Sequence, residues 1–169
     1  MATITHYFHP EMAQFPTANY PQLKKTAGTN FPVSGLAFDG GSTDESCTFK
    51  FVATSYGSGN LTVTVYWYAD SASSGNVVFG AAISAITPNT DSQDIETDAF
   101  ATANTVQDAH LGTTGQRLHS ADIAVSNLDS IAAGDHVFLQ IYRDASDTTN
   151  DTMTGDAIIT LVTLSYSDT

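Results

Sequence analysis

The feature that most constrains this fold is a two-residue alternation of apolar and polar side chains between Asp39 and Thr87. Three consecutive segments carry the alternation, and each ends at a turn rich in Gly and Ser. In the second, apolar and polar residues alternate without a break from Leu61 to Tyr68. Because successive side chains of a strand point to opposite faces, this period marks strands with one buried face. The pattern predicts β-sheets and leaves the chemistry open.

From Pro32 onward, the alternation and the turn signals predict a single all-β domain. The expected strands are about 33–39, 45–53, 60–69, 76–87, 103–109, 116–126, 136–143 and 156–166. Between them we expect a long acidic loop over 88–104 and one helical turn over 127–133. Eight short strands without helical periodicity are typical of an antiparallel β-sandwich, most naturally a jelly roll, and 169 residues suffice for it. The expected core includes Phe49, Phe51, Val63, Val65, Trp67, Val137, Leu139, Ile141, Ile158 and Val162.

The first 32 residues differ from the rest and predict an extended N-terminal arm, followed by the sandwich domain over 33–169. Four of the five prolines lie there, with aromatic residues spaced between them. Proline removes a backbone donor and biases the preceding residue toward extended geometry. The arm is expected to strap either its own domain or a neighbouring subunit, and the sequence leaves both open.

The charge of the chain disfavours two classes of partner. Its formal net charge is −13, from 18 acidic and 5 basic residues. Because Lys24 and Lys25 outweigh Glu11 by one charge, residues 33–169 carry −14. Such a field repels phosphate backbones and anionic lipids, so we expect no nucleic-acid or membrane binding. The N-terminal residues lack the pattern of a secretory signal, which predicts synthesis in a reducing cytoplasm.

Candidate catalytic and metal-binding residues lack the spacing that their chemistry needs. No Ser has a Gly-x-Ser-x-Gly context, and Ser120 and His119 are neighbours on a strand, so they point to opposite faces. His6 and His9 lie on a proline-flanked arm without a second ligand pair. The acidic loops do not match an EF-hand and read as solvated turns. We therefore expect a non-enzymatic protein with no cofactor and no metal, in which the single cysteine, Cys47, is a core residue.

The candidate residues are instead those suited to contact a partner. Tyr66 and Tyr68 lie on the strand face opposite Trp67, where the two rings are able to stack on sugars or to be covered by protein. Lys50, Arg117 and Arg143 are candidates for charge contacts with an acidic partner, or else for solvated or intramolecular positions. The full set of partner-contact candidates is Tyr7, Phe8, Phe15, Tyr20, Lys24, Lys25, Tyr66 and Tyr68.

Over residues 33–166 the chain resembles a family of small virion proteins of tailed bacteriophages. The resemblance rests on Phe38-Asp-Gly-Gly-Ser-Thr-Asp-Glu-Ser-Cys-Thr-Phe, on Leu61 to Ala69, and on Gly75-Asn-Val-Val-Phe-Gly. Near the C-terminus, Arg143-Asp-Ala-Ser-Asp and Asp151-Thr-Met-Thr-Gly-Asp-Ala resemble the last hairpin of that family. These motifs are structural and carry no catalytic signature.

The resemblance implies a jelly-roll capsid cement or decoration protein on the outer capsid surface of the virion. Such a protein would bind the major capsid protein, self-associate as a dimer or trimer, and stabilise the lattice through mass action. The alternative hypothesis is a carbohydrate-binding β-sandwich of a tail fibre or adhesin. A tail or neck component of the same virion is a third.

Overall fold

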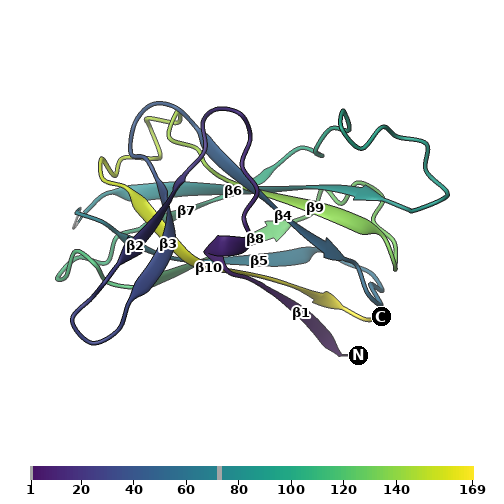
Figure 1. Cartoon of the computed structure of the whole chain (residues 1–169), viewed down its shortest axis with the longest axis horizontal. Coiled ribbons are helices and arrows are strands. Elements are labelled where there is room, and N and C mark those ends of the chain that lie inside the picture. The colour runs from purple at the N-terminus through teal and green to yellow at the C-terminus, as the bar shows by residue number, and fades with distance from the viewer. Residues whose placement is uncertain (1, 72–73) are drawn as a thin grey trace.

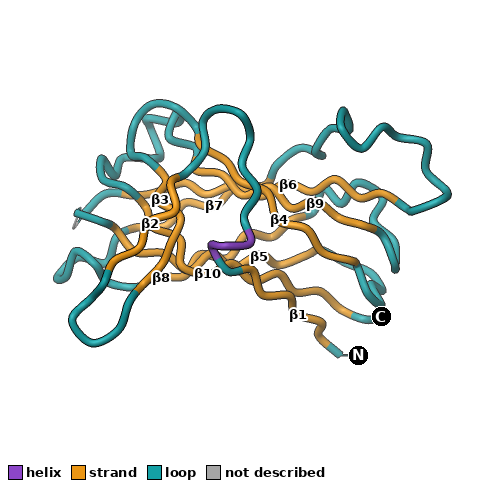
Figure 2. Tube along the Cα trace, in the orientation of Figure 1, coloured by secondary structure: helices purple, strands orange, loops and turns teal. Residues whose placement is uncertain are grey.

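The computed structural model describes residues 2–71 and 74–169. They fold into two antiparallel β-sheets packed face to face (Figure 1). The expected all-β sandwich is confirmed, although ten strands are described rather than eight. The strands are β1 (Thr3–Phe8), β2 (Gln22–Thr26), β3 (Val33–Phe38), β4 (Glu45–Val52), β5 (Leu61–Ala69), β6 (Asn76–Ile86), β7 (Asn104–Ala109), β8 (His119–Val125), β9 (His136–Arg143) and β10 (Ala157–Ser167). One short 3-10 helix, η1 (Pro10–Met12), is the purple segment of Figure 2.

The strands β3 to β10 form a jelly roll. One sheet has the order β2-β3-β10-β5-β8 and the other β4-β9-β6-β7. Seven of the eight predicted strands both begin and end within two residues of the observed ones, whereas β8 begins three residues later than expected. Along one edge of β10, β3 pairs with residues 157–159 and β1 with residues 162–167, so β1 continues the edge where β3 leaves it.

The ten residues predicted to lie in the core, from Phe49 to Val162, are all buried, but Ile158 lies opposite Tyr68 on the outer face of the six-stranded sheet and not between the sheets. Cys47 is also buried, as its alternation with Phe49 and Phe51 predicted. Burial raises the pKa of its thiol because the thiolate would be desolvated.

One predicted element does not form. The helical turn expected over 127–133 is replaced by two turns, in which Asp129 and Ser130 have positive φ angles of 48° and 57°. The Asp129 carboxylate accepts the Ala85 backbone N–H at 2.8 Å, which fixes the turn against β6 instead of continuing a helix. Ile131 is nevertheless buried. The stretch 88–103 is a long loop, as predicted.

The N-terminal segment lies on its own domain. Its strand β1 adds to β10, and β2 pairs with β3 across the predicted boundary at residue 32. The Phe8 ring is 2% exposed and stacks on Phe49 with ring centroids 5.2 Å apart. The structure therefore corrects the choice of Phe8 as a contact for another chain, because the ring belongs to the core of its own sandwich.

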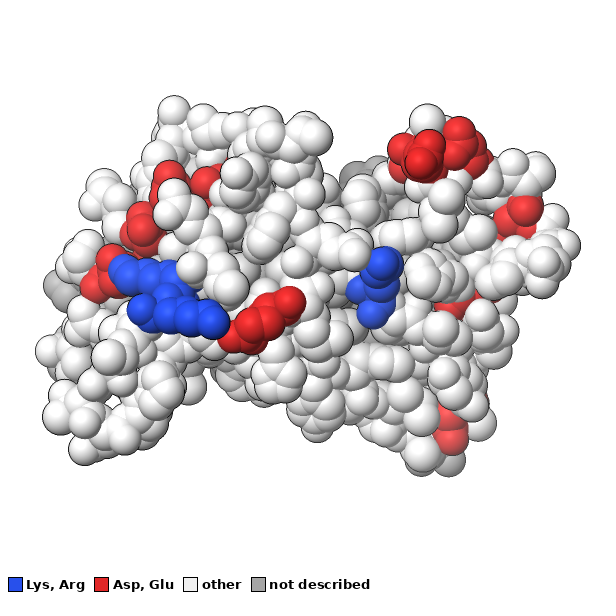
Figure 3. Space-filling view, viewed as in Figure 1, with Lys and Arg blue, Asp and Glu red and all other residues white. Residues whose placement is uncertain are grey.

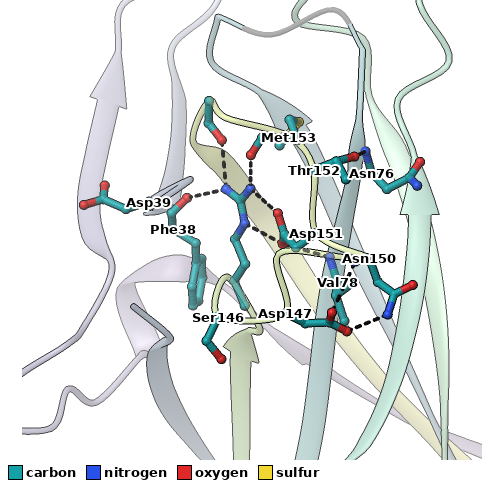
Figure 4. Close-up of polar contacts among 12 residues, drawn as sticks. Phe38, Asp39, Asn76, Val78, Ser146, Asp147, Asn150, Asp151, Thr152 and Met153 are labelled. Carbon is teal, nitrogen blue, oxygen red and sulfur yellow. Dashed lines mark hydrogen bonds and ion pairs between the residues drawn. The ribbon is translucent and has the colours of Figure 1, made fainter. Parts of the chain in front are cut away.

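Arg143 is a second correction. Its side chain is wholly buried and is enclosed by Asp151 and the carbonyls of the last hairpin (Figure 4). It is therefore not a surface cation for an acidic partner, and the intramolecular alternative holds.

Candidate functional site

The outer face of β9 forms the floor of a groove. Phe138, Gln140 and Tyr142 point outward and are half-buried, whereas Val137, Leu139 and Ile141 alternate with them into the core. This alternation follows from the pleat, which sends every second side chain to the same face.

Mostly small side chains on both neighbouring strands flank this floor, and the two walls on either side make it a trough. On β6, Gly80, Ala82 and Ser84 lie opposite Tyr142, Gln140 and Phe138. On β4, Ser46 and Thr48 lie opposite Tyr142 and Gln140. Short side chains therefore flank the larger ones of β9 except beside Phe138, where Lys50 of β4 lies opposite and is exposed.

One wall of the groove comes from the N-terminal segment. Gln14 and Thr48 exchange two backbone hydrogen bonds of 2.9 Å, which fixes this segment against the edge of β4. Phe15 and Pro16 follow and line the hollow. This wall therefore depends on the way the arm folds back across its own domain.

The opposite wall is the loop between β6 and β7. Its residues Ile95, Glu96, Asp98 and Phe100 line the groove. The loop is tied to the sheet by the Ala101 N–H, which donates to the Ile83 carbonyl at 2.8 Å, and by the Ser84 hydroxyl, which donates to Asp98 at 2.7 Å. In Figure 1 this loop and the 13–21 segment rise on the same side of the sheet that holds β4, β6 and β9.

The groove comprises two adjoining hollows of about 340 and 460 Å³, which share Ser46, Phe100 and Gln140. Such volumes suit a ligand of a few rings rather than a single ion. The lining mixes aromatic rings with hydroxyls, amides and carboxylates.

Tyr142 is held in a defined place by a glycine. A Cβ atom added to Gly80 would lie 2.1 Å from Tyr142 Cε1 and 2.6 Å from its hydroxyl oxygen. The absence of a side chain at Gly80 thus leaves the space that the Tyr142 ring occupies across β6. Burial raises the pKa of Tyr142, and the carboxylates of Asp144 and Asp44 raise it further.

The groove is electrically negative. Three of its lining residues are carboxylates, namely Asp44, Glu96 and Asp98, and none is Lys, Arg or His. Figure 3 shows acidic side chains gathered at the upper right, where Figure 1 places the β6–β7 loop, while basic side chains lie mainly over β2.

A separate hollow, of about 460 Å³, lies on the outer face of the six-stranded sheet. Tyr68 borders it together with Phe31 and Leu118, which are 70% and 61% exposed. Its lining is largely apolar, in contrast to the groove over β9.

The aromatic candidates from the sequence fall into separate places. Phe15 lines the groove, and Tyr20 lies beside it with ring centroids 5.6 Å apart. Tyr7 is exposed on β1, and Tyr66 and Tyr68 are half-buried on the outer face of β5. The structure therefore brings Phe15 and Tyr20 together and leaves the tyrosines of β5 on the opposite sheet.

The lysine candidates lie on β2, away from the groove. Lys24 forms an ion pair of 2.6 Å with Asp70, which raises the pKa of the lysine. Lys25 is exposed. Neither contributes to the floor or walls described above.

The three floor residues of β9 and Phe100 were not among the predicted site residues. The alternation over 136–143 contained a signal for the floor, because it separates outward Phe138, Gln140 and Tyr142 from the core residues. The prediction used only the apolar half of that pattern.

Two buried histidines lie at the end of the core near Trp67. The His119 ring stacks on Trp67 with centroids 4.4 Å apart, and the His110 ring lies 4.8 Å from His119. His110 Nδ1 accepts the Gly112 N–H, which leaves Nε2 as the donor to the Gly115 carbonyl. His119 Nε2 is buried and has no hydrogen-bond partner among the residues that the structure describes.

Within the residues that the structure describes, no three His, Cys, Asp or Glu side chains are grouped to hold a metal ion. No helix in the same residues is long and apolar enough to cross a membrane.

Comparison with known proteins identifies the fold class and no family. No protein-family model matches the chain, and no curated protein matches its sequence. Among solved structures, the chain is similar to isomalto-dextranase of Arthrobacter globiformis T6 complexed with panose, at 15% identity and a TM-score of 0.52, over 98% of this chain and 23% of that one. It is also similar to the CBM36-1 domain of a multidomain xylanase from the hindgut metagenome of Trinervitermes trinervoides (10% identity, TM-score 0.49, 95% and 96% covered). A third similar structure is the C-terminal CBM6 of LamC, a marine laminarinase from Zobellia galactanivorans, at 11% identity and a TM-score of 0.47, over 95% of this chain and 98% of that one.

Proposed function

We propose that the protein is a non-catalytic carbohydrate-binding β-sandwich and that the groove over β9 is its binding site. Sugar rings present an apolar face to aromatic side chains and hydroxyls to polar ones. A pocket that binds them combines exposed rings with a few fixed hydrogen-bonding groups. The groove offers both, and the solved structures above bear on the fold alone.

The observation that carries the proposal is the order of side chains along β9. Phe138 and Tyr142 lie on the same face with Gln140 between them, all half-buried and open to the trough. Four strand residues span about 13 Å, so the two rings are spaced for an oligosaccharide rather than a single sugar. The Gln140 amide carries donors and an acceptor between them.

The experiment is binding of the full chain to an array of neutral, amino and acidic glycans, followed by calorimetry with the best ligand. We expect Phe138→Ala, Gln140→Ala and Tyr142→Ala each to weaken binding at least tenfold, which corresponds to about 1.4 kcal/mol. Tyr66→Ala and Tyr68→Ala remove matched rings from the other sheet and should leave the affinity unchanged. Glycan binding that depends on Tyr66 and Tyr68 instead would place the binding site on the outer face of β5 and contradict the proposed groove. Binding to no glycan on the array would refute the carbohydrate-binding function.

The second candidate is the capsid decoration role that the sequence resemblance implies. It is favoured by the apolar hollow on the six-stranded sheet, where Phe31 and Leu118 are largely exposed. Exposed apolar side chains around a hollow are suited to contact a protein partner, here the major capsid protein or a second copy of the chain.

This role predicts that tailed-phage capsids carrying the protein release their DNA at a higher temperature than capsids without it. Phe31→Ser and Leu118→Ser should abolish both the attachment and the shift, whereas Phe138→Ala should change neither. Equal release temperatures with and without bound protein would contradict the stabilising role.

A further inference from the structure

We infer that the groove over β9 selects sugar chains by charge, so that it binds amine-bearing chains best, neutral chains next and uronic or sulfated chains worst. This inference rests on the proposed carbohydrate-binding function and specifies the ligand class of the same groove. It follows from where the carboxylates stand and from the position of the basic residues.

Carboxylates stand at both ends of the floor. At the Phe138 end, Asp98 is held over β6 because it accepts the Ser84 hydroxyl at 2.7 Å, and Glu96 is exposed on the wall beside it. At the Tyr142 end, Asp44 is fixed by the Ser146 N–H and hydroxyl at 2.8 and 3.1 Å. A chain lying along β9 therefore passes carboxylates at each end.

Cations do not balance these charges within the lining. The nearest basic residue in the sheet register is Lys50 on β4, which lies opposite Phe138 and is exposed. Lys24 and Lys25 belong to β2 in the other sheet, and Arg143 is buried against Asp151. Three carboxylates thus line the groove, and Lys50 lies outside that lining.

Like charges repel more strongly where water is partly excluded, as it is in a walled trough. An acidic sugar bound along the floor would place its carboxylate or sulfate within such a trough, close to Asp98 or Asp44. An amine at the same place would be attracted. Neutral sugars would be indifferent to the field and would bind through the rings and Gln140.

The test uses sugar chains of one linkage that differ only in charge, namely the neutral, amine-bearing and uronic forms of the best backbone on the array. Titrations run at about pH 5.5, between the ordinary pKa values of carboxyl groups and amines. We expect the uronic chain to bind at least tenfold more weakly than the neutral chain and the amine-bearing chain at least threefold more tightly. Raising the salt from about 0.01 to 1 M should shrink both differences, since the Debye length falls from about 30 to 3 Å.

Isosteric neutralisation locates the effect. The double variant Glu96→Gln/Asp98→Asn should shrink the ratio of neutral-chain affinity to uronic-chain affinity at least threefold, whatever it does to the affinity for either chain alone. Asp122→Asn makes the same charge change on the outer face of the other sheet and should alter neither affinity.

The outcomes separate the inference from the function on which it rests. Equal or tighter binding of the uronic chain, lost in Phe138→Ala, would overturn the charge selection and leave the groove as a glycan site. Binding to no sugar chain of any charge would overturn both.

Discussion

The guanidinium of Arg143 is held in two hydrogen bonds by the Asp151 carboxylate, with Nε at 2.9 Å from Oδ2 and Nη2 at 2.7 Å from Oδ1. Both side chains are buried, and the remaining Arg143 donors reach the carbonyls of Phe38, Gly155 and Met153 (Figure 4). Asp151 Oδ2 also accepts the Val78 N–H at 3.0 Å. The pair thus joins β3, β6 and β9 to the hairpin that leads into β10.

Removing one partner of this pair should be strongly destabilising. Asp151→Ala leaves a buried guanidinium without its counter-charge, and we expect the free energy of unfolding to fall by about 3–5 kcal/mol in urea denaturation. Asp122→Ala is the matched control, because Asp122 is exposed on β8 and accepts a hydrogen bond only from the Thr64 hydroxyl among the described residues, so it should cost about 1 kcal/mol or less. Similar costs for both variants would show that the buried pair is not a stabilising contact.

Replacing Gly80 should disturb the groove more than the fold. A Cβ at Gly80 would collide with the far end of the Tyr142 side chain, which is able to swing aside. We expect Gly80→Ala to weaken glycan binding as much as Tyr142→Ala does, with a loss of stability of about 1–2 kcal/mol at most. Gly41→Ala, which meets nothing within 4 Å, should leave both properties unchanged. Wild-type affinity in Gly80→Ala would mean that the position of Tyr142 does not matter.

Two phenylalanines of the N-terminal segment should have opposite effects. Phe8 is in the core and Phe15 is on the groove wall. Phe8→Ala should lower the free energy of unfolding by about 3–5 kcal/mol. Phe15→Ala should leave stability nearly unchanged and weaken glycan binding. A stable Phe8→Ala variant would indicate that the segment does not pack on its own domain.

The free energy of unfolding should decrease as the pH is lowered, because of His119. Burial lowers its pKa, and the neighbouring His110 and Arg117 side chains lower it further, although Asp108 opposes the shift. The unfolded chain therefore takes up a proton at a higher pH than the folded one, and stability declines as the pH falls below about 6.5, then levels off below the folded pKa.

His119→Phe keeps a ring against Trp67 and removes the titration, so its urea midpoint should fall less between pH 7.5 and 5. The flattening is expected to be partial, because burial also lowers the pKa of His6. A variant with the same pH dependence as the wild type would exclude His119 as a cause.

Cys47 should be inert in the folded protein. Its side chain is fully buried, and burial raises the pKa of its thiol, so little thiolate is present or accessible. A thiol reagent should modify the chain in denaturant and not in native buffer. Rapid modification of the native protein would contradict the packing of β4.

The β-sandwich was predictable because the alternation of apolar and polar side chains can be read within each strand, and its apolar half forms the core. Val63, Val65 and Trp67 alternate in sequence and are buried together in the structure. The strand β1 escaped prediction, although Ile4, His6 and Phe8 alternate inward, because the prolines that follow indicated an arm.

The groove was predictable only in part. The residues of its floor follow from the alternation along β9, because they lie between Val137 and Leu139 and their neighbours in the core. Its two walls contain Phe15 and Glu96, which come from segments far apart in the chain. Their meeting depends on the Gln14–Thr48 bridge and on a loop without periodicity, and no local pattern encodes either. Tyr66 and Tyr68 follow the same kind of alternation on the other sheet, and their role as partner contacts stays a prediction.

The most direct test of the account is to map, by amide chemical shifts, where the best sugar ligand from the array binds the wild-type protein. The account predicts that the shifts concentrate at Phe138, Gln140, Tyr142 and the 95–100 loop and that they vanish in Tyr142→Ala. Shifts confined to β5 and Leu118, or no shift with any sugar, would contradict it.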